Sequence, residues 1–186
     1  MQKPLIVVLL GLPGSGKTTF ARQLAERIQG VTLSSDAMRL SIYKTREAAQ
    51  AARDEDRVLS NQYVFGALNY AARQALRAGH NVIFDAVVSH RSEREEKYEF
   101  AREFGAAAIL VRIQVPREVS LRRMQERTPT EDQRQFHEEK AIGVFNYFAQ
   151  ELEEPTPDEP VVYIDGEAPF ETQYQAFLEE VTQLSQ

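Results

Sequence analysis

Short apolar runs alternate along the chain with longer stretches in which apolar positions recur every three or four residues. A run of this kind is typical of a strand buried on both faces of a parallel sheet, and the longer period is typical of a helix with one buried face. The short runs predict five strands, at residues 4–10, 31–34, 81–86, 107–115 and 161–164. Because helical patterns separate the strands, we expect an α/β fold with helices on both faces of a parallel sheet.

The helical patterns lie between these strands and after the last one. Phe20, Leu24 and Ile28 mark the first helix, which we expect to end at Gly30. Further helices are predicted at residues 47–78 with one break, at 91–104, 117–127 and 131–152, and over the stripe from Phe170 to Val181. The stretch 153–160 holds three prolines and four acidic residues and is predicted to be a loop. Asp165 and Gly166 are expected to form a turn.

Length and composition narrow the class of protein. A chain of 186 residues fits one domain. The absence of cysteine excludes disulfides, zinc–thiolate sites and cysteine nucleophiles. The apolar run from Leu5 to Leu10 is too short for a membrane span or a signal peptide, so we expect a soluble, cytoplasmic protein with no membrane partner. The net charge of −6 argues against binding along the length of a nucleic acid.

Residues 11–18, GLPGSGKT, match the pattern G-x-x-x-x-G-K-[ST] in full. The glycines let successive backbone N–H groups face a phosphate, and the following helix presents its positive end to the same anion. Lys17 is expected to reach the β- and γ-phosphates of ATP, and the Thr18 hydroxyl is expected to ligate Mg²⁺. The residues predicted to bind the nucleotide are Gly11, Pro13, Gly14, Ser15, Gly16, Lys17, Thr18 and Thr19.

The rest of the chain selects among the classes of P-loop protein. No lysine follows an asparagine, as a guanine-reading Asn-Lys-x-Asp motif would require, which argues against a GTPase. Asp85 is followed by Ala86, and Asp165 by Gly166, so no predicted strand ends in the Asp-Glu pair with which a motor ATPase would activate water. A small kinase remains. An ATP-binding module that hydrolyses ATP slowly and acts through a partner is the alternative from another class.

Candidate acceptor residues follow the second and third predicted strands. The ends of parallel strands meet at the edge where ligands bind, so Asp36 is expected near the γ-phosphate, where it can accept a proton from an attacking hydroxyl. Arg39 lies three residues further on and faces the same way if a helix begins here. In the alternative interpretation, Ser35 or Asp36 only caps that helix. Asp85 either holds a magnesium-bound water, orients Arg39, contacts the acceptor or forms an Asx turn.

The helix predicted at 117–127 is rich in arginine. Arg122 has a glutamate four residues to either side and is expected to be charge-balanced within the helix. Arg123 instead meets Arg127, a like-charge pair that costs about 0.2–0.5 kcal/mol in an isolated helix and that a bridging anion would relieve. We predict that Arg123 and Arg127 contact phosphate and that a flap at 128–133 closes over it. A solvated charged face is the alternative.

Four stretches together resemble the P-loop kinases grouped around the phage polynucleotide 5′-kinase, which include zeta-toxin and chloramphenicol phosphotransferase kinases. The stretches are GLPGSGKTTFAR at 11–22, SSDAMR at 34–39, NVIFDAVVSHRSER at 81–94 and VPREVSLRRMQER at 115–127. The resemblance implies a strand order of 2-3-1-4-5. It also implies a general-base role for Asp36, an acceptor-phosphate contact for Arg39, an acceptor-site role for Asp85, and ATP-phosphate contacts for Arg123 and Arg127.

The sequence therefore predicts an ATP- and Mg²⁺-dependent kinase that phosphorylates a hydroxyl group, most like a polynucleotide 5′-hydroxyl kinase. A small-molecule O-kinase acting on a sugar, nucleoside or antibiotic is the first alternative. We expect one domain over residues 1–186 with an arginine-bearing lid at about 117–152. The expected catalytic residues are Lys17, Asp36, Arg123 and Arg127. The expected partners are a nucleoside triphosphate and a hydroxyl-bearing acceptor such as a 5′-OH nucleic-acid end, without an obligate protein partner.

Overall fold

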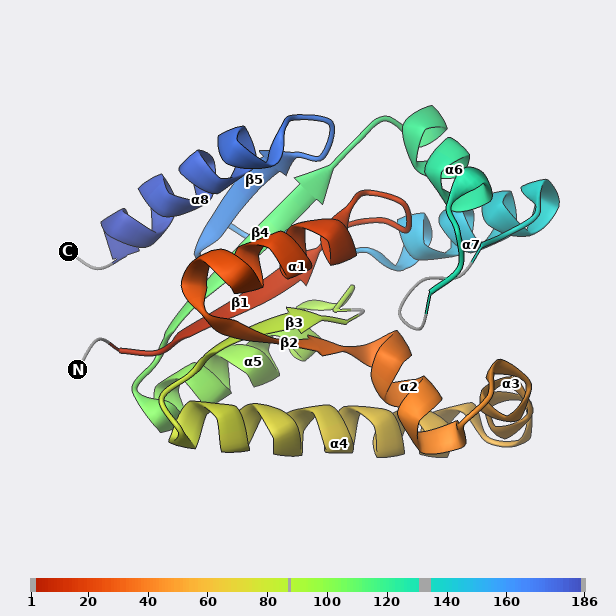
Figure 1. The fold of residues 1–186 in the computed structure, drawn as a ribbon, viewed down its shortest axis with the longest axis horizontal. Coiled ribbons are helices and arrows are strands. Elements are labelled where there is room, and N and C mark those ends of the chain that lie inside the picture. The colour runs from red at the N-terminus through yellow and green to blue at the C-terminus, as the bar shows by residue number, and fades with distance from the viewer. Residues whose placement is uncertain (1–2, 87, 131–134, 185–186) are drawn as a thin grey trace.

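A single five-stranded parallel sheet forms the centre of the computed structural model, which describes residues 3–86, 88–130 and 135–184 (Figure 1). The strand order is β2-β3-β1-β4-β5, with all neighbouring pairs parallel. The strands are β1 (Leu5–Leu10), β2 (Gly30–Ser34), β3 (Asn81–Asp85), β4 (Ala107–Gln114) and β5 (Val161–Asp165). The predicted fold class and strand order are confirmed, and each predicted strand end lies within one residue of the observed one.

Two hydrophobic layers cover the sheet. Ile6, Val8 and Leu10 of β1 face one layer, and Val7 and Leu9 face the other, so the strand is buried on both sides. The first layer belongs to α4 (Arg57–Arg77) and α5 (Arg91–Phe104), and the second to α1 (Lys17–Ile28) and α8 (Phe170–Leu184). Full burial of one such aliphatic side chain contributes about 1.5–3 kcal/mol, and all six residues of β1 are buried, so this strand is a central part of the core.

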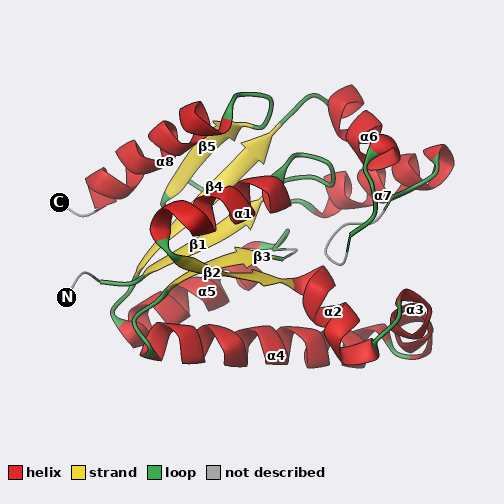
Figure 2. Ribbon diagram, viewed as in Figure 1, coloured by secondary structure: helices red, strands yellow, loops and turns green. Residues whose placement is uncertain are grey.

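Four helices lie beyond the carboxyl ends of the strands, outside the two layers (Figure 2). They are α2 (Ser35–Tyr43), α3 (Arg46–Glu55), α6 (Arg117–Glu126) and α7 (Glu138–Glu151). α2 and α3 pack with the end of α4, while α6 and α7 pack on each other around Met124, Ala141 and Phe145. The predicted break in the helix at 47–78 falls at Asp56, whose carboxylate accepts a hydrogen bond of 2.9 Å from the N–H of Leu59 and so caps α4.

The helix predicted at 131–152 begins later, at Glu138. Residues 131–134 lie outside the described residues, and with them half of the flap predicted at 128–133. Residues 135–137 are not helical. Phe136 donates its N–H to the carbonyl of Met124 (3.1 Å), and the Gln135 side chain donates to the carbonyl of Gln125 (2.7 Å). These bonds satisfy the end of α6 and hold the segment extended, so the predicted start of the helix was wrong.

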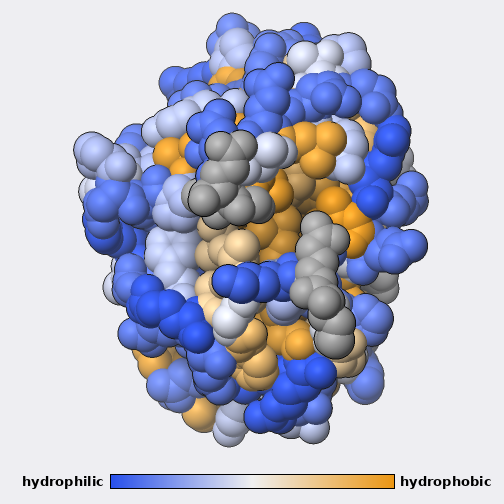
Figure 3. Space-filling model, turned by 90° about the vertical axis from the view of Figure 1, so that its left-hand side faces the viewer, coloured by the Kyte–Doolittle hydropathy of each residue, from blue (hydrophilic) through white to orange (hydrophobic). Residues whose placement is uncertain are grey.

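The face at which the strands begin lies opposite these four helices. Apolar surface gathers in the middle of this face, within a hydrophilic border (Figure 3). Val31, at 36% exposure, contributes to the apolar surface of the chain. A folded domain normally exposes apolar side chains in this way, so this surface alone does not indicate a site. Among the described residues, none of the helices is long and apolar enough to cross a membrane.

Candidate active site

A cleft of about 1020 Å³ opens at the carboxyl ends of the strands. Its walls come from the loop after β1, from α2, α3 and α4, from the end of β3, and from α6 and α7. Parallel sheets place ligand sites at this edge, because strand ends and helix N-termini converge there. The volume is at the upper end of the range for small-molecule sites and leaves room for two reactants side by side.

The loop after β1 needs its glycines. Gly14 and Gly16 have φ angles of +85° and +103°, in the left-handed region that side chains rarely adopt. A Cβ atom on Gly14 would also lie 2.4 Å from the carbonyl oxygen of Ser120 in α6. The N–H of Ser15 closes the turn on the carbonyl of Leu12 at 3.1 Å. The loop therefore has the tight curvature that the motif predicts.

Lys17 lies inside this loop. Its ammonium donates to the carbonyl oxygens of Gly11 (2.7 Å) and Leu12 (3.0 Å). Burial lowers the pKa of Lys17 from 10.5 to about 8, and the negative charge of Asp85 opposes that shift. A phosphate placed here would act in the same direction as Asp85 and favour the charged ammonium.

The eight predicted nucleotide-binding residues divide into two groups. Gly11 and Ser15 are not among the lining residues: Ser15 is 2% exposed, and a Cβ on Gly11 would lie 2.6 Å from its hydroxyl oxygen. Gly11 and Ser15 therefore contribute to the shape of the loop and do not face the cleft. The residues of the motif that line the cleft are Pro13, Gly14, Gly16, Lys17, Thr18 and Thr19. Thr18 is thus available as a metal ligand, although the described residues contain no cluster of three or more histidine or acidic side chains that would hold an ion by itself.

Asp36 lies in the first turn of α2 and lines the cleft. The residue that caps α2 is Ser34, whose hydroxyl accepts a hydrogen bond of 3.3 Å from the N–H of Ala37. The alternative in which Ser35 or Asp36 serves as the cap is therefore wrong. Ser34 pairs in register with Asp85 of β3, and this pairing brings the segments that carry the two acidic residues to the same edge.

Arg39 and Asp85 are both almost buried, at 5% and 7% exposure, and both line the cleft. The guanidinium of Arg39 donates to Ser60 (3.4 Å) and Asn61 (3.1 Å) of α4. The predicted grouping of Asp36, Arg39 and Asp85 is observed. The structure does not test the roles assigned to them, which stay predictions.

Two arginines at the end of α6 line the cleft: Arg123 within the helix and Arg127 directly after it. Arg123 donates to the carbonyl of Gly166 at 3.1 Å, next to the nucleotide loop. Arg127 lies over the ring of Phe136 at 5.6 Å, and burial lowers its pKa while Asp36 raises it. Arg122 is exposed and is not a lining residue. Among the described residues it forms no close ion pair with the glutamates of its helix, and the charge balance stays a prediction.

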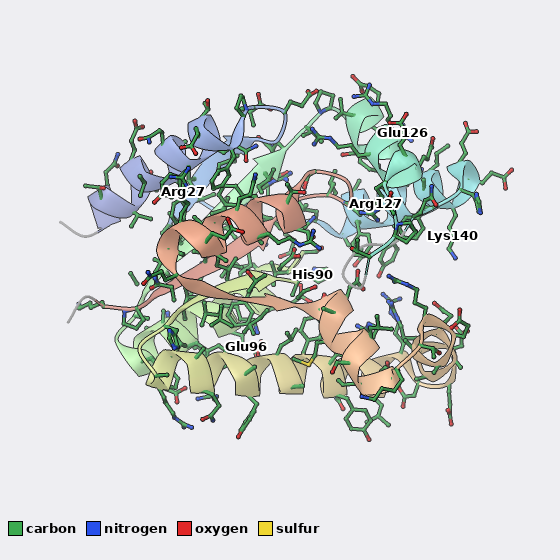
Figure 4. All side chains as sticks on the ribbon, in the orientation of Figure 1. Arg27, His90, Glu96, Glu126, Arg127 and Lys140 are labelled. Atoms are coloured by element: carbon green, nitrogen blue, oxygen red, sulfur yellow. The ribbon has the colours of Figure 1, made fainter. Side chains whose placement is uncertain are left out.

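His90 lies between the end of α7 and the loop that follows it (Figure 4). Its ring nitrogens lie 3.3 Å from a carboxylate oxygen of Glu151 and 3.2 Å from one of Glu153. The hydrogen bond to Glu153 is the largest cause of the raised pKa of His90. The loop itself is held by Arg94, whose buried guanidinium binds Glu159 at 2.7 and 2.9 Å. The C-terminal end of α7 and the loop that follows it are therefore held against the start of α5.

Sequence reasoning missed a large part of the cleft wall. The missed residues come from three helices in which the sequence analysis named no site residue. They are Gln50, Arg53, Asp54, Arg57, Asn61 and Phe65 of α3 and α4, and Lys140, Gly143, Val144, Tyr147, Phe148 and Glu151 of α7. The α7 residues recur every three or four positions, which was visible in the sequence, but that period does not say what the face meets.

Three comparisons with known proteins bear on this site. A family model described as an AAA domain matches residues 6–152. UPF0200 proteins of Saccharolobus islandicus and Saccharolobus solfataricus are 28% identical over 135 residues, covering 72% of this chain and 70% of each relative.

The solved structures with a similar fold include three kinases. An unliganded sugar kinase from Janibacter sp. HTCC2649 matches with a TM-score of 0.68 and 20% identity, covering 97% of this chain and 95% of the other. A gluconokinase from Sinorhizobium meliloti 1021 matches with a TM-score of 0.64 and 18% identity, with coverages of 99% and 95%. A deoxyadenosine kinase from M. mycoides matches with a TM-score of 0.59 and 14% identity, with coverages of 96% and 99%. At these identities the likeness shows a common fold.

Proposed function

We propose that this chain, which belongs to the AAA domain family, is a P-loop kinase that transfers the γ-phosphate of ATP to a hydroxyl acceptor. The observation that carries the proposal is the position of Asp36. Its helix is capped by Ser34, and its carboxylate lines the same cleft as Lys17 and Arg127, where its negative charge opposes the lowering of both pKa values by burial. A carboxylate at this place suits proton abstraction from an acceptor. The kinase activity of the structural neighbours supports the proposal.

In the proposed reaction, the backbone N–H groups of the loop and the ammonium of Lys17 hold the phosphates of ATP. Thr18 is the predicted residue that would hold Mg²⁺, and the ion would supply positive charge that offsets the charge of the phosphates. Asp36 accepts the hydroxyl proton as the acceptor oxygen bonds to the γ-phosphorus and the bond to ADP breaks. Arg123 and Arg127 stabilise the charge on the transferred group.

The acceptor has two candidates. The predicted candidate is the 5′-hydroxyl end of a polynucleotide, with Arg39 on its first phosphate. A small molecule is the second candidate. Contacts that cross the cleft, from α3 and α4 to residues 130–147, favour it. Arg46 of α3 donates to the carbonyl of Thr130, and Arg57 of α4 donates to the hydroxyl of Tyr147 in α7 at 2.9 Å. Both contacts join the α3–α4 wall to the lid and restrict the space for a long polymer. The names of the sugar kinase and gluconokinase neighbours point the same way.

The test is a screen of labelled ATP against oligonucleotides, nucleosides, sugars and antibiotics. Label on an acceptor supports a kinase, whereas release of inorganic phosphate alone supports the module that acts through a partner. Lys17→Ala should abolish transfer without unfolding the protein, because the ammonium bonds to the loop carbonyls of Gly11 and Leu12 and not to a core side chain, and its expected task is to hold the phosphates. Lys3→Ala, an exposed lysine outside the cleft, is the matched control. Near-normal turnover by a folded Lys17→Ala variant would overturn the proposal.

A further inference from the structure

The cleft-facing side of α7 has a gap at its centre. Lys140, Gly143 and Tyr147 line the cleft from successive turns of this helix. A Cβ atom on Gly143 would meet nothing within 4 Å. Glycine destabilises a helix interior relative to alanine, so a glycine with open space around it is not explained by the packing of the fold. The missing side chain leaves room in the cleft.

Two cations stand on either side of this gap. Lys140 lies in the first turn of α7, and Arg57 is the first residue of α4, on the opposite wall. The Arg57 guanidinium lies 5.5 Å from the ring centre of Tyr147 and donates to its hydroxyl. A positive charge at a helix N-terminus opposes the helix dipole, so neither cation stabilises its own helix. None of the ion pairs found among the described residues involves Arg57 or Lys140.

The acidic residues in this half of the cleft already have hydrogen-bond partners. Asp54 accepts from the side chain of Gln50 at 2.7 Å. Glu93 accepts from the N–H of His90 at 3.0 Å, and Glu151 lies 3.3 Å from the ring of the same histidine. Lys140 points from α7 into the space above α3 (Figure 4). The oxygens of these carboxylates are thus engaged within the protein, whereas Lys140 and Arg57 can still donate hydrogen bonds to a ligand at the outer end of the cleft.

We propose that this outer end binds an anionic group of the acceptor between Lys140 and Arg57, with the body of the acceptor over Gly143 and its hydroxyl directed to Asp36. The inference rests on the proposed function and narrows it to a class of acceptor. That class is a hydroxyl compound with a carboxylate or phosphate remote from the reacting hydroxyl. The planar fork of Arg57 suits either group, and the ammonium of Lys140 adds a second charge.

The experiment measures binding by calorimetry to protein loaded with Mg²⁺ and a non-hydrolysable ATP analogue. Two matched pairs separate the anions: gluconate against glucose for a carboxylate, and adenosine 3′-monophosphate against adenosine for a phosphate. In at least one pair the anionic member should bind ten or more times tighter. Lys140→Ala and Arg57→Ala should each remove most of that preference, and Lys140→Arg should retain it. Equal binding in both pairs, or a preference that survives both alanine substitutions, would overturn the proposal.

Gly143→Ala tests the gap, and Gly66→Ala is its matched control. Gly66 lies within α4, outside the cleft, and a Cβ there also meets nothing within 4 Å. Both substitutions should raise Tm by about 2–4 °C, since alanine is the better helix former. Only Gly143→Ala should weaken binding of the preferred anionic probe, by about tenfold or more. Wild-type affinity in Gly143→Ala would remove Gly143 from the subsite.

The two proposals fail in different ways. If an anionic probe binds with dependence on Lys140 but no compound accepts label from ATP, the subsite stands and the kinase proposal fails. If neutral acceptors are phosphorylated and Lys140→Ala changes nothing, the kinase proposal stands and the subsite fails.

Discussion

Ser34 and Asp36 lie two residues apart and have separate tasks in the structure. The Ser34 hydroxyl caps α2, and the Asp36 carboxylate faces the cleft. Asp36→Asn should therefore lower kcat by about 10²–10⁴-fold, the usual contribution of a general base, with little change in Tm. Steady-state kinetics and thermal unfolding of the same preparation measure both effects.

Ser34→Ala provides the contrast. Loss of the capping hydroxyl should cost about 0.5–2 kcal/mol of stability, and kcat should fall far less than in Asp36→Asn. A destabilised Asp36→Asn variant that retains activity would show that the carboxylate is structural after all.

His90 titrates between two carboxylates, which hold its pKa above the ordinary value of 6.5. The protonated ring therefore adds stability that is fully present below pH 6.5 and is lost as the pH rises through the higher folded value. NMR should show the His90 midpoint above 6.5. Glu153→Gln should move it back toward 6.5, because the hydrogen bond to Glu153 is the largest cause of the shift.

Glu118→Gln is the matched control for this titration, since Glu118 is exposed on α6. A His90 midpoint that Glu153→Gln leaves in place would mean that the ring does not bond to Glu153 in solution. Since the histidine and both glutamates are substantially exposed, the contribution to stability is expected to be small and to weaken with salt.

At the scale of the element, α6 directs some of its arginines into the cleft and others to solvent. Arg123→Ala and Arg127→Ala should each lower kcat tenfold or more, because both guanidinium groups line the cleft beside the nucleotide loop. Arg122→Ala should do much less, because Arg122 is exposed and outside the lining. The exposed position of the Arg122 side chain, outside the cleft, is enough to explain the small effect on kcat. Steady-state kinetics of the three variants test this expectation. If Arg122→Ala lowers kcat the most, the assignment of the arginines that face the cleft is wrong.

The elements that sequence predicted best are those determined by local pattern. An apolar run such as β1 is buried on both faces, so its identity as a strand did not depend on what packs against it. The start of α7 did depend on a neighbour. Gln135 and Phe136 bind the backbone at the end of α6, and no periodicity within residues 131–138 carries that information. The boundary therefore required the tertiary structure.

The site shows the same division. The nucleotide loop was readable because glycine spacing determines its backbone, and Asp36, Arg39 and Asp85 were readable because parallel strands end at one edge. Arg57 and Lys140 could not be identified as site residues from the sequence. A charged residue on a helix usually faces water, and only the packing of α4 and α7 at opposite sides of the cleft turns these two inward.

At the scale of the whole molecule, the net charge is −6, whereas among the residues that the structure describes the cleft is lined by seven basic and six acidic side chains, so basic residues are concentrated there relative to the rest of the chain. Positive charge confined to a cleft supports a local grip on an anion and not a long electrostatic track. The contacts from Arg46 to Thr130 and from Arg57 to Tyr147 cross the cleft and restrict the length of polymer that can lie in it, which also favours a local grip. Any nucleic acid bound here should be held by its terminal phosphate or two.

This local grip gives a measurable salt dependence. For a 5′-hydroxyl oligonucleotide, log K against log salt should have a slope between about −0.7 and −2, since each neutralised phosphate of a single strand contributes about −0.7. Arg39→Ala should remove roughly one phosphate's share of that slope. Affinity should stop rising once the strand exceeds a few nucleotides. A slope near about −5 with affinity that keeps rising with length would contradict a local grip. If no such oligonucleotide binds or is phosphorylated, the acceptor is the small anionic hydroxyl compound for which Lys140 and Arg57 are placed.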